Sequence, residues 1–243
     1  SFTPVEVMRC LRSASCHCFL LESAERDQKW GRWSFLGYQP SLELTCSDGT
    51  LRIRSGDEEN FQETVIPTPN PGEKIRELLH QYKSPKLPGL PPFTGGFVGY
   101  FSYDYIKYTE PVLQENAPEA RDFRDVDLML FDQVIVFDHY RQKLLIIAGV
   151  SVEDIERSYQ KAKDTIQEII ALLNSNAKAH FPHLHLKTAL TPRFTQTEYG
   201  EMVEKAKQYI HEGDIFQVVL SNPMTAAAQG SLFDTYRVLR ASN

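Results

Sequence analysis

The sequence predicts an α+β fold of layered, mainly antiparallel β-sheets with outer helices. Short runs of alternating apolar and polar residues, separated by turn residues, dominate the first half of the chain. Segments with helical spacing do not alternate with these runs in the regular order of βαβ units, which disfavours a doubly wound parallel sheet. No internal repeat or low-complexity segment interrupts this order.

The length and charge of the chain limit its class. With 243 residues, 42% hydrophobic and 24% charged, it has the composition of one or two globular domains. Lys and Arg number 26 against 32 Asp and Glu, which gives a formal net charge of −6. A negative field repels phosphate backbones, so nucleic acid is not an expected partner.

The cysteines and the apolar runs indicate the compartment. The four cysteines are too few and too clustered for a secreted disulfide framework, so we expect reduced thiols. The first residues lack the basic stretch and apolar run of a signal peptide, and no run approaches the roughly 20 apolar residues of a membrane span. We therefore expect a cytoplasmic protein without a membrane partner.

The N-terminal third predicts one helix followed by strands. Thr3-Pro4 precedes apolar residues at helical spacing, and proline is tolerated in a first turn because its missing N–H is not needed there. A compact run without glycine or proline at 16–23 predicts a strand. The same pattern, with a turn at 47–49, predicts further strands at residues 33–37, 41–46 and 51–54.

The middle of the chain predicts a helix at 71–83, which the proline-rich run after it ends. Residues 93–101 alternate glycine with bulky apolar residues, which is typical of a strand that another backbone approaches closely. Two apolar runs within 127–148, broken at 138–141, predict a long β-hairpin.

The C-terminal part predicts two structural units. A long amphipathic helix at 152–173 ends a first domain, residues 1–174. The polar segment 175–193 is the expected linker, and residues 194–243 form the second unit. Within that unit we expect a helix at 197–211, a strand at 215–221 and a helix at 232–239.

The residues alone indicate no metal site and no catalytic constellation. Cys16 and Cys18 flank a histidine, but adjacent strand residues point to opposite faces and no second cysteine pair lies at finger spacing. The histidines of 180–185 lie in the expected linker, which favours surface positions. Gly95–Gly99 is not followed by the Lys-Ser/Thr of a phosphate loop. The tyrosine-rich segment 100–108 is better explained by packing than by base stacking in an acidic chain.

Four segments nevertheless stand out in this order: Leu20-Leu21-Glu22-Ser23, Trp30–Gly37, Phe93–Tyr100 and Gly213–Ser221. Together they resemble component I of the anthranilate synthase family of chorismate-utilising enzymes. The resemblance implies that this chain is an N-terminal fragment with an incomplete anthranilate/aminodeoxychorismate synthase-like fold. Residues 1–174 would be its N-terminal domain and 194–243 the truncated start of its chorismate-binding domain.

The resemblance implies a lyase reaction in which chorismate and ammonia give anthranilate and pyruvate, in tryptophan biosynthesis. It also implies Mg²⁺ as cofactor and a glutamine amidotransferase subunit as the source of ammonia. In the family, the metal-binding glutamates, the catalytic histidine and the substrate arginine lie beyond the position of Asn243. We therefore expect no catalytic or metal-binding residue in this chain, and no synthase activity from it alone.

The resemblance also implies a regulatory site. In the family, the Leu-Leu-Glu-Ser strand lines the pocket in which L-tryptophan binds as feedback inhibitor, and Leu21, Glu22 and Ser23 match it. The residues alone leave an alternative, that Ser23 merely ends a buried strand and Glu22 is its solvated face. Arg32 is a weaker candidate for a further polar contact. Gln217 is equally consistent with substrate orientation and with a buried strand glutamine satisfied by backbone groups.

Two alternative functions stay open from the sequence. The first is component I of aminodeoxychorismate synthase in the folate pathway; the Leu-Leu-Glu-Ser motif favours the anthranilate branch, but the motif that discriminates the two lies beyond Asn243. The second is a stand-alone, non-catalytic module for amino-acid binding or subunit docking. An ending inside a helix-to-strand connection disfavours this module.

Overall fold

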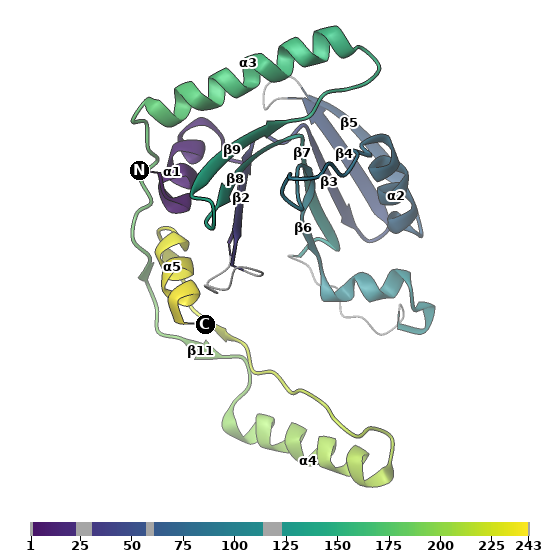
Figure 1. Cartoon of the computed structure of the whole chain (residues 1–243). Helices are drawn as coiled ribbons and strands as arrows, with labels where there is room; N and C mark the ends of the chain where they lie inside the picture. Colours follow the sequence, from purple (N-terminus) through teal and green to yellow (C-terminus); the bar gives the residue numbers. More distant parts are fainter. Residues whose placement is uncertain (1, 23–30, 57–60, 114–122, 243) are drawn as a thin grey trace. The chain divides into compact units, whose positions relative to one another are not determined.

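The structure is a computed structural model that describes residues 2–22, 31–56, 61–113 and 123–242. It divides into two units, Ser1–Ala179 and His180–Asn243. Helices and antiparallel sheets make up the first unit, which confirms the predicted α+β class (Figure 1). No helix among the described residues is long and apolar enough to cross a membrane.

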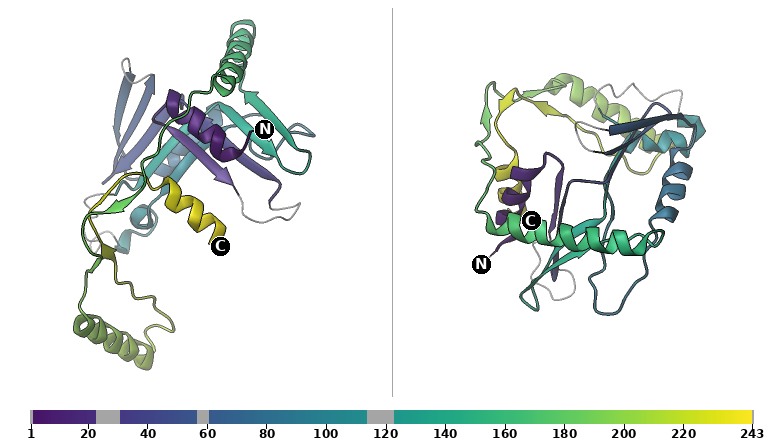
Figure 2. Two further views of the ribbon diagram at one scale, coloured as in Figure 1. Left: turned by 90° about the vertical axis from the view of Figure 1, so that its left-hand side faces the viewer. Right: turned by 90° about the horizontal axis from the view of Figure 1, so that it is seen from above.

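A four-stranded antiparallel sheet in the order β1-β2-β8-β9 forms one layer of the first unit. Helices α1 (Pro4–Ala14) and α3 (Ile155–Asn174) pack on one of its faces through a core that includes Val7, Leu36 and Ile169. Figure 2 shows this helical layer from two further directions. The strands are β1 (Cys18–Glu22), β2 (Trp33–Tyr38), β8 (Gln133–Asp138) and β9 (Lys143–Ala148).

A five-stranded antiparallel sheet in the order β5-β4-β3-β7-β6 forms the second layer. Helix α2 (Pro71–Gln81) and the 3₁₀ helix η1 (Tyr103–Tyr108) contribute to its core, whereas η2 (Pro111–Leu113) is a short turn after η1. The strands are β3 (Leu42–Ser47), β4 (Thr50–Gly56), β5 (Phe61–Pro67), β6 (Gly96–Phe101) and β7 (Val126–Phe131).

A third apolar cluster joins the two sheets. Phe19 and Val136 come from the four-stranded sheet, and Phe131 and Met129 come from the five-stranded sheet. The ring centroids of Phe19 and Phe131 lie 4.7 Å apart in an edge-to-face arrangement, which aromatic pairs prefer. The four-stranded sheet therefore buries apolar side chains on both faces.

The predicted hairpin at 127–148 is partly wrong. Only β8 and β9 form a hairpin, whereas the first apolar run is divided at Asp132 into β7 and β8, which belong to different sheets. The backbone carbonyl of Asp132 accepts a hydrogen bond from Gly149 N, and its side chain is exposed. Both β7 and β8 are apolar because each contributes to a core. Their hydrophobicity therefore does not indicate that the chain passes from one sheet to the other at Asp132.

The second unit contains helices α4 (Gln196–Glu212) and α5 (Phe233–Ser242) and two small ladders. The predicted strand at 215–221 is wrong, because no described strand pairs with these residues and Phe216 is 93% exposed. The predicted division of the chain at 174 and 194 stays a prediction. The ladders pair β10 (His185–Leu186) with β13 (Ala228–Gln229) and β11 (Thr191–Pro192) with β12 (Met224–Thr225).

Candidate functional site

The end of β1 carries the residues that the resemblance assigns to an effector site. Among the described residues β1 pairs only with β2, where Leu21 lies opposite Phe35 and Glu22 lies opposite Ser34. Successive strand residues point to opposite faces, so Leu21 and Glu22 are adjacent in the chain but present their side chains on opposite faces. Leu21 is 49% exposed, and Ser23 lies outside the described residues.

A partly buried ion pair, in which the carboxylate is buried and the arginine side chain is 27% exposed, lies beside this strand end. Arg32 directly precedes β2, and its Nε and Nη2 donate to Oδ1 and Oδ2 of Asp138 at 3.0 and 2.6 Å. Asp138, the last residue of β8, is only 3% exposed. The hydrogen bonds from Arg32 hold the pKa of Asp138 down at about 2. Because two of its donor nitrogens bind Asp138, we interpret Arg32 as a residue that fixes the strand ends and not as a direct effector contact.

Ser34 and His139 extend this polar cluster toward β1. A hydrogen bond of 2.7 Å joins Ser34 Oγ to His139 Nε2, and the Ser34 residue is 1% exposed. The His139 backbone N–H also donates to the carbonyl oxygen of Arg32 at 2.9 Å. Sequence reasoning missed Asp138 and His139 as members of this cluster; their only signal was a polar pair directly after a buried apolar run.

Protonation of the Asp138 carboxylate in acid is expected to lower the free energy of unfolding. The folded-state pKa is lowered from 3.8 to about 2, so the stabilisation is complete above about pH 4 and is lost as the pH falls toward 2. The stability difference between wild type and Asp138→Asn should narrow by about 2 kcal/mol over this range. Urea denaturation at several pH values measures it, and a difference independent of pH would contradict the assignment.

A second buried carboxylate, Asp125, holds the turn between β3 and β4. Its Oδ2 accepts hydrogen bonds from Tyr108 Oη at 2.7 Å and from Asp48 N at 2.9 Å, and Lys107 Nζ lies 2.9 Å from its Oδ1. Gly49 N donates to Tyr108 Oη at 2.7 Å. Burial and the bond to Asp125 raise the pKa of Tyr108, which therefore stays a neutral donor. These contacts connect η1 to the five-stranded sheet and serve stability.

Removing the hydroxyl of Tyr108 tests this network. Tyr108→Phe leaves the Gly49 N–H and one Asp125 oxygen without this partner, so we expect a loss of about 1 to 3 kcal/mol in the free energy of unfolding. Tyr103→Phe is the matched control because Tyr103 is 91% exposed, and its effect should stay within about 0.5 kcal/mol. Equal losses in the two variants, measured by urea denaturation, would exclude the network as their cause.

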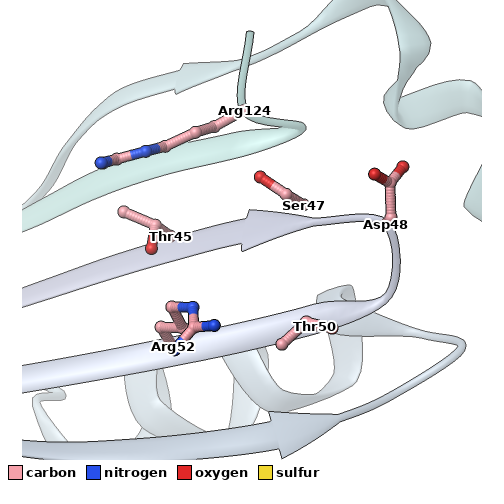
Figure 3. Close-up of a pocket in the computed structure, with 6 residues that line it drawn as sticks. All are labelled: Thr45, Ser47, Asp48, Thr50, Arg52 and Arg124. Carbon is pink, nitrogen blue, oxygen red and sulfur yellow. The ribbon is translucent and has the colours of Figure 1, made fainter. Parts of the chain in front are cut away.

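A shallow polar pocket lies elsewhere, on the five-stranded sheet (Figure 3). Its volume is about 380 Å³. Arg52 already pairs with Glu63 at 3.3 Å, and Arg124 pairs with Asp127 at 3.0 Å, so both cations have carboxylate partners. The pocket is lined by Thr45, Ser47, Asp48, Thr50, Arg52 and Arg124.

The described residues do not fit a Mg²⁺ site, because they contain no group of three or more histidine, cysteine, aspartate or glutamate residues that could hold a metal ion. Within the motif 16–18, His17 pairs with Glu43 at 2.9 Å. Burial raises the pKa of the Cys18 thiol to about 11, which keeps it protonated and disfavours metal binding. Gln217 is exposed and lies outside any strand, so its interpretation as a buried strand glutamine is wrong.

Comparisons with known proteins place the chain in a family. The profile of the chorismate binding enzyme family matches residues 16–243. Anthranilate synthase component 1 of Acetivibrio thermocellus is 36% identical over 252 residues, and that of Aquifex aeolicus (strain VF5) is 33% identical over 245 residues. Each alignment covers 99% of this chain and 49% of the relative, so the chain spans about half the length of these proteins.

A solved structure agrees with the sequence matches. The crystal structure of anthranilate synthase component I from Streptococcus pneumoniae TIGR4 superposes with a TM-score of 0.67 at 28% identity. The match covers 94% of this chain and 48% of that one, which again corresponds to about half of the relative. From the profile match over most of its length, the chain belongs to the chorismate binding enzyme family.

Proposed function

We propose that this chain is the N-terminal part of the large subunit of anthranilate synthase. The observation that carries the proposal is the 36% identity to anthranilate synthase component 1 of Acetivibrio thermocellus across 99% of the chain. The complete subunit would convert chorismate and ammonia to anthranilate and pyruvate in the cytoplasm. Residues 1–174 would form its N-terminal domain, and residues 194–243 would begin its chorismate-binding domain.

The chemistry is assigned to the part of the subunit beyond this chain. Mg²⁺ would act there as a Lewis acid that orients the carboxylates of chorismate. A glutamine amidotransferase subunit would supply the ammonia. Because the resemblance places the metal-binding glutamates and the catalytic histidine beyond the position of Asn243, we expect the chain alone to be inactive.

The product formed from chorismate tests this assignment. The complete large subunit, supplied with chorismate, Mg²⁺ and ammonium, is expected to form anthranilate, which fluorescence and mass spectrometry detect. The 243-residue chain is the control and should form none. Aminodeoxychorismate as the product would support the folate-pathway alternative instead. No turnover of chorismate by an intact, folded subunit would favour a non-catalytic module.

We further propose that L-tryptophan binds at the end of β1 as a feedback inhibitor, through Leu21, Glu22 and Ser23. Among the described strands β1 lies at a sheet edge, and this position supports the proposal because the strand end is accessible where Leu21 is half-exposed. The Glu22 carboxylate would bind the ammonium group, since charge-assisted hydrogen bonds are the stronger kind. The Ser23 hydroxyl would bind the carboxylate.

Titration calorimetry of L-tryptophan into the complete subunit tests the effector site. Glu22→Gln and Ser23→Ala are each expected to weaken binding about tenfold or more, which corresponds to losing one hydrogen bond to a charged group. Glu63→Gln, on the other sheet and paired with Arg52, is the matched control and should bind normally. p-Aminobenzoate should not bind. Wild-type affinity in both site variants would exclude this location.

A further inference from the structure

Arg32 and Asp138 connect two strands at the sheet end where β1 stops. In the register of β2 with β8, Trp33 lies opposite Asp138, so Arg32 directly precedes the paired region. The two Arg32–Asp138 bonds measure 3.0 and 2.6 Å, and Arg141 N donates to the same carboxylate at 3.0 Å. The planar guanidinium presents its donors in a fixed geometry, so a two-point bond to a carboxylate fixes the orientation of both groups.

Further contacts lead from this pair to Glu22. His139 follows Asp138 in the chain, and its backbone N–H binds the carbonyl oxygen of Arg32. Its Nε2 binds the hydroxyl of Ser34, which is the residue directly opposite Glu22 in the β1–β2 register. Residues directly opposite each other share a face, so Ser34 and Glu22 lie on the same face of the sheet. Hydrogen bonds therefore connect Asp138 to Ser34, and the strand register places Ser34 opposite Glu22.

Because β1 lies at the edge of the described sheet, the position of Glu22 depends on how firmly β2 is held. Within the described part of the chain β1 has β2 as its single strand partner, so the placement of Glu22 depends on the start of β2. The Arg32 guanidinium also lies 4.3 Å from the centroid of the Trp33 ring and 5.7 Å from that of Tyr140. The start of β2 is therefore held by an ion pair and by ring contacts.

We propose that Arg32 and Asp138 are positioning residues for amino-acid effector binding, which act by fixing the start of β2 and through it the orientation of Glu22. This inference rests on the proposed effector site at the end of β1. The role of Arg32 would be indirect. Its ion pair with Asp138 would set the affinity for an α-amino acid, although the Arg32 guanidinium does not contact that ligand.

Tryptophan titration of the complete subunit with Arg32 variants tests the proposal. Arg32→Gln removes the charge, and Arg32→Lys keeps the charge but loses the two-point geometry. We expect Arg32→Gln to weaken tryptophan binding about tenfold and Arg32→Lys about threefold, the range found for residues that modulate a site without touching its ligand. Tyr108→Phe, which weakens the other sheet, is the control for general instability and should bind within about twofold of wild type.

Each outcome decides the proposal. Tryptophan affinity that falls from wild type to Arg32→Lys and again to Arg32→Gln supports a positioning role. A purely structural role would lower the thermal stability of the variants without this order in affinity. Wild-type affinity in both Arg32 variants overturns the proposal and leaves the effector site standing. An equal loss in Tyr108→Phe also overturns it. Absence of binding by the wild-type subunit overturns the effector site and this inference together.

Discussion

Asp138→Asn is expected to lower the free energy of unfolding by about 2 to 3 kcal/mol, because the charge-assisted hydrogen bonds from Arg32 to a buried carboxylate are weakened. Asp138 is 3% exposed and accepts both hydrogen bonds from Arg32. Asparagine keeps the shape of the side chain, so the loss comes from the charge and the second acceptor oxygen. The residue also accepts the Arg141 N–H in the turn after β8.

Urea denaturation followed by circular dichroism measures this effect. Asp127→Asn is the matched control, because Asp127 forms an ion pair of similar length, 3.0 Å, with the exposed Arg124. An exposed ion pair contributes little, so the control should lose less than about 1 kcal/mol. A loss in Asp138→Asn as small as that in the control would show that the partly buried pair is not a major contributor to stability.

Gly99→Ala is expected to destabilise the five-stranded sheet by about 3 kcal/mol, the upper range for overpacking. A Cβ at Gly99 would overlap the backbone carbonyl oxygen of Asp127 and would lie 2.9 Å from Leu128 Cα. Neither is the movable end of a side chain, so the strand β6 or β7 itself must shift. This close approach explains why a glycine stands at position 99 in the glycine-rich segment 93–101.

Thermal denaturation of Gly99→Ala and Gly200→Ala provides the comparison. Gly200 lies within α4, and a Cβ there meets nothing within 4 Å. Alanine is favoured over glycine inside a helix by about 0.5 to 1 kcal/mol, so this variant should lose no stability. A Gly99→Ala protein that unfolds at the wild-type temperature would contradict the close approach of β6 to β7.

The helices were largely predictable from the sequence because the signals that define them are local. At α1 and α4, a threonine side chain accepts the N–H of the glutamate three residues later, and that glutamate binds back to the threonine. The structure moves the start of α3 from the predicted 152 to Ile155, because Asp154 caps the helix. The predicted starts of α2 and α4 lie within one residue of those observed.

The strands were less predictable because strand pairing joins residues far apart in the chain. The strand β5 was not predicted, although it forms the edge beside β4, and the expected strand at 215–221 found no partner among the described residues. The division of the apolar run at Asp132 depends on which sheet each half joins. Alternation of hydrophobicity identifies a buried strand but carries no information about its neighbours.

The candidate site was predictable in part. The Leu-Leu-Glu-Ser motif located the end of β1, and the structure confirms a strand over Cys18–Glu22. The cluster around it was not predictable, because Arg32 and Asp138 are separated by 106 residues and meet only through the pairing of β2 with β8. Nothing local to Arg32 identifies a carboxylate so distant in sequence as its partner.

The formation of anthranilate by the complete subunit, recorded as a function of L-tryptophan concentration, tests the proposed function most directly. It examines in one experiment the reaction of the proposed subunit and the effector site at the end of β1. We expect anthranilate to form from chorismate and ammonium, and tryptophan to suppress its formation to near zero. Formation of aminodeoxychorismate in place of anthranilate, or a rate that does not respond to tryptophan, would contradict this expectation.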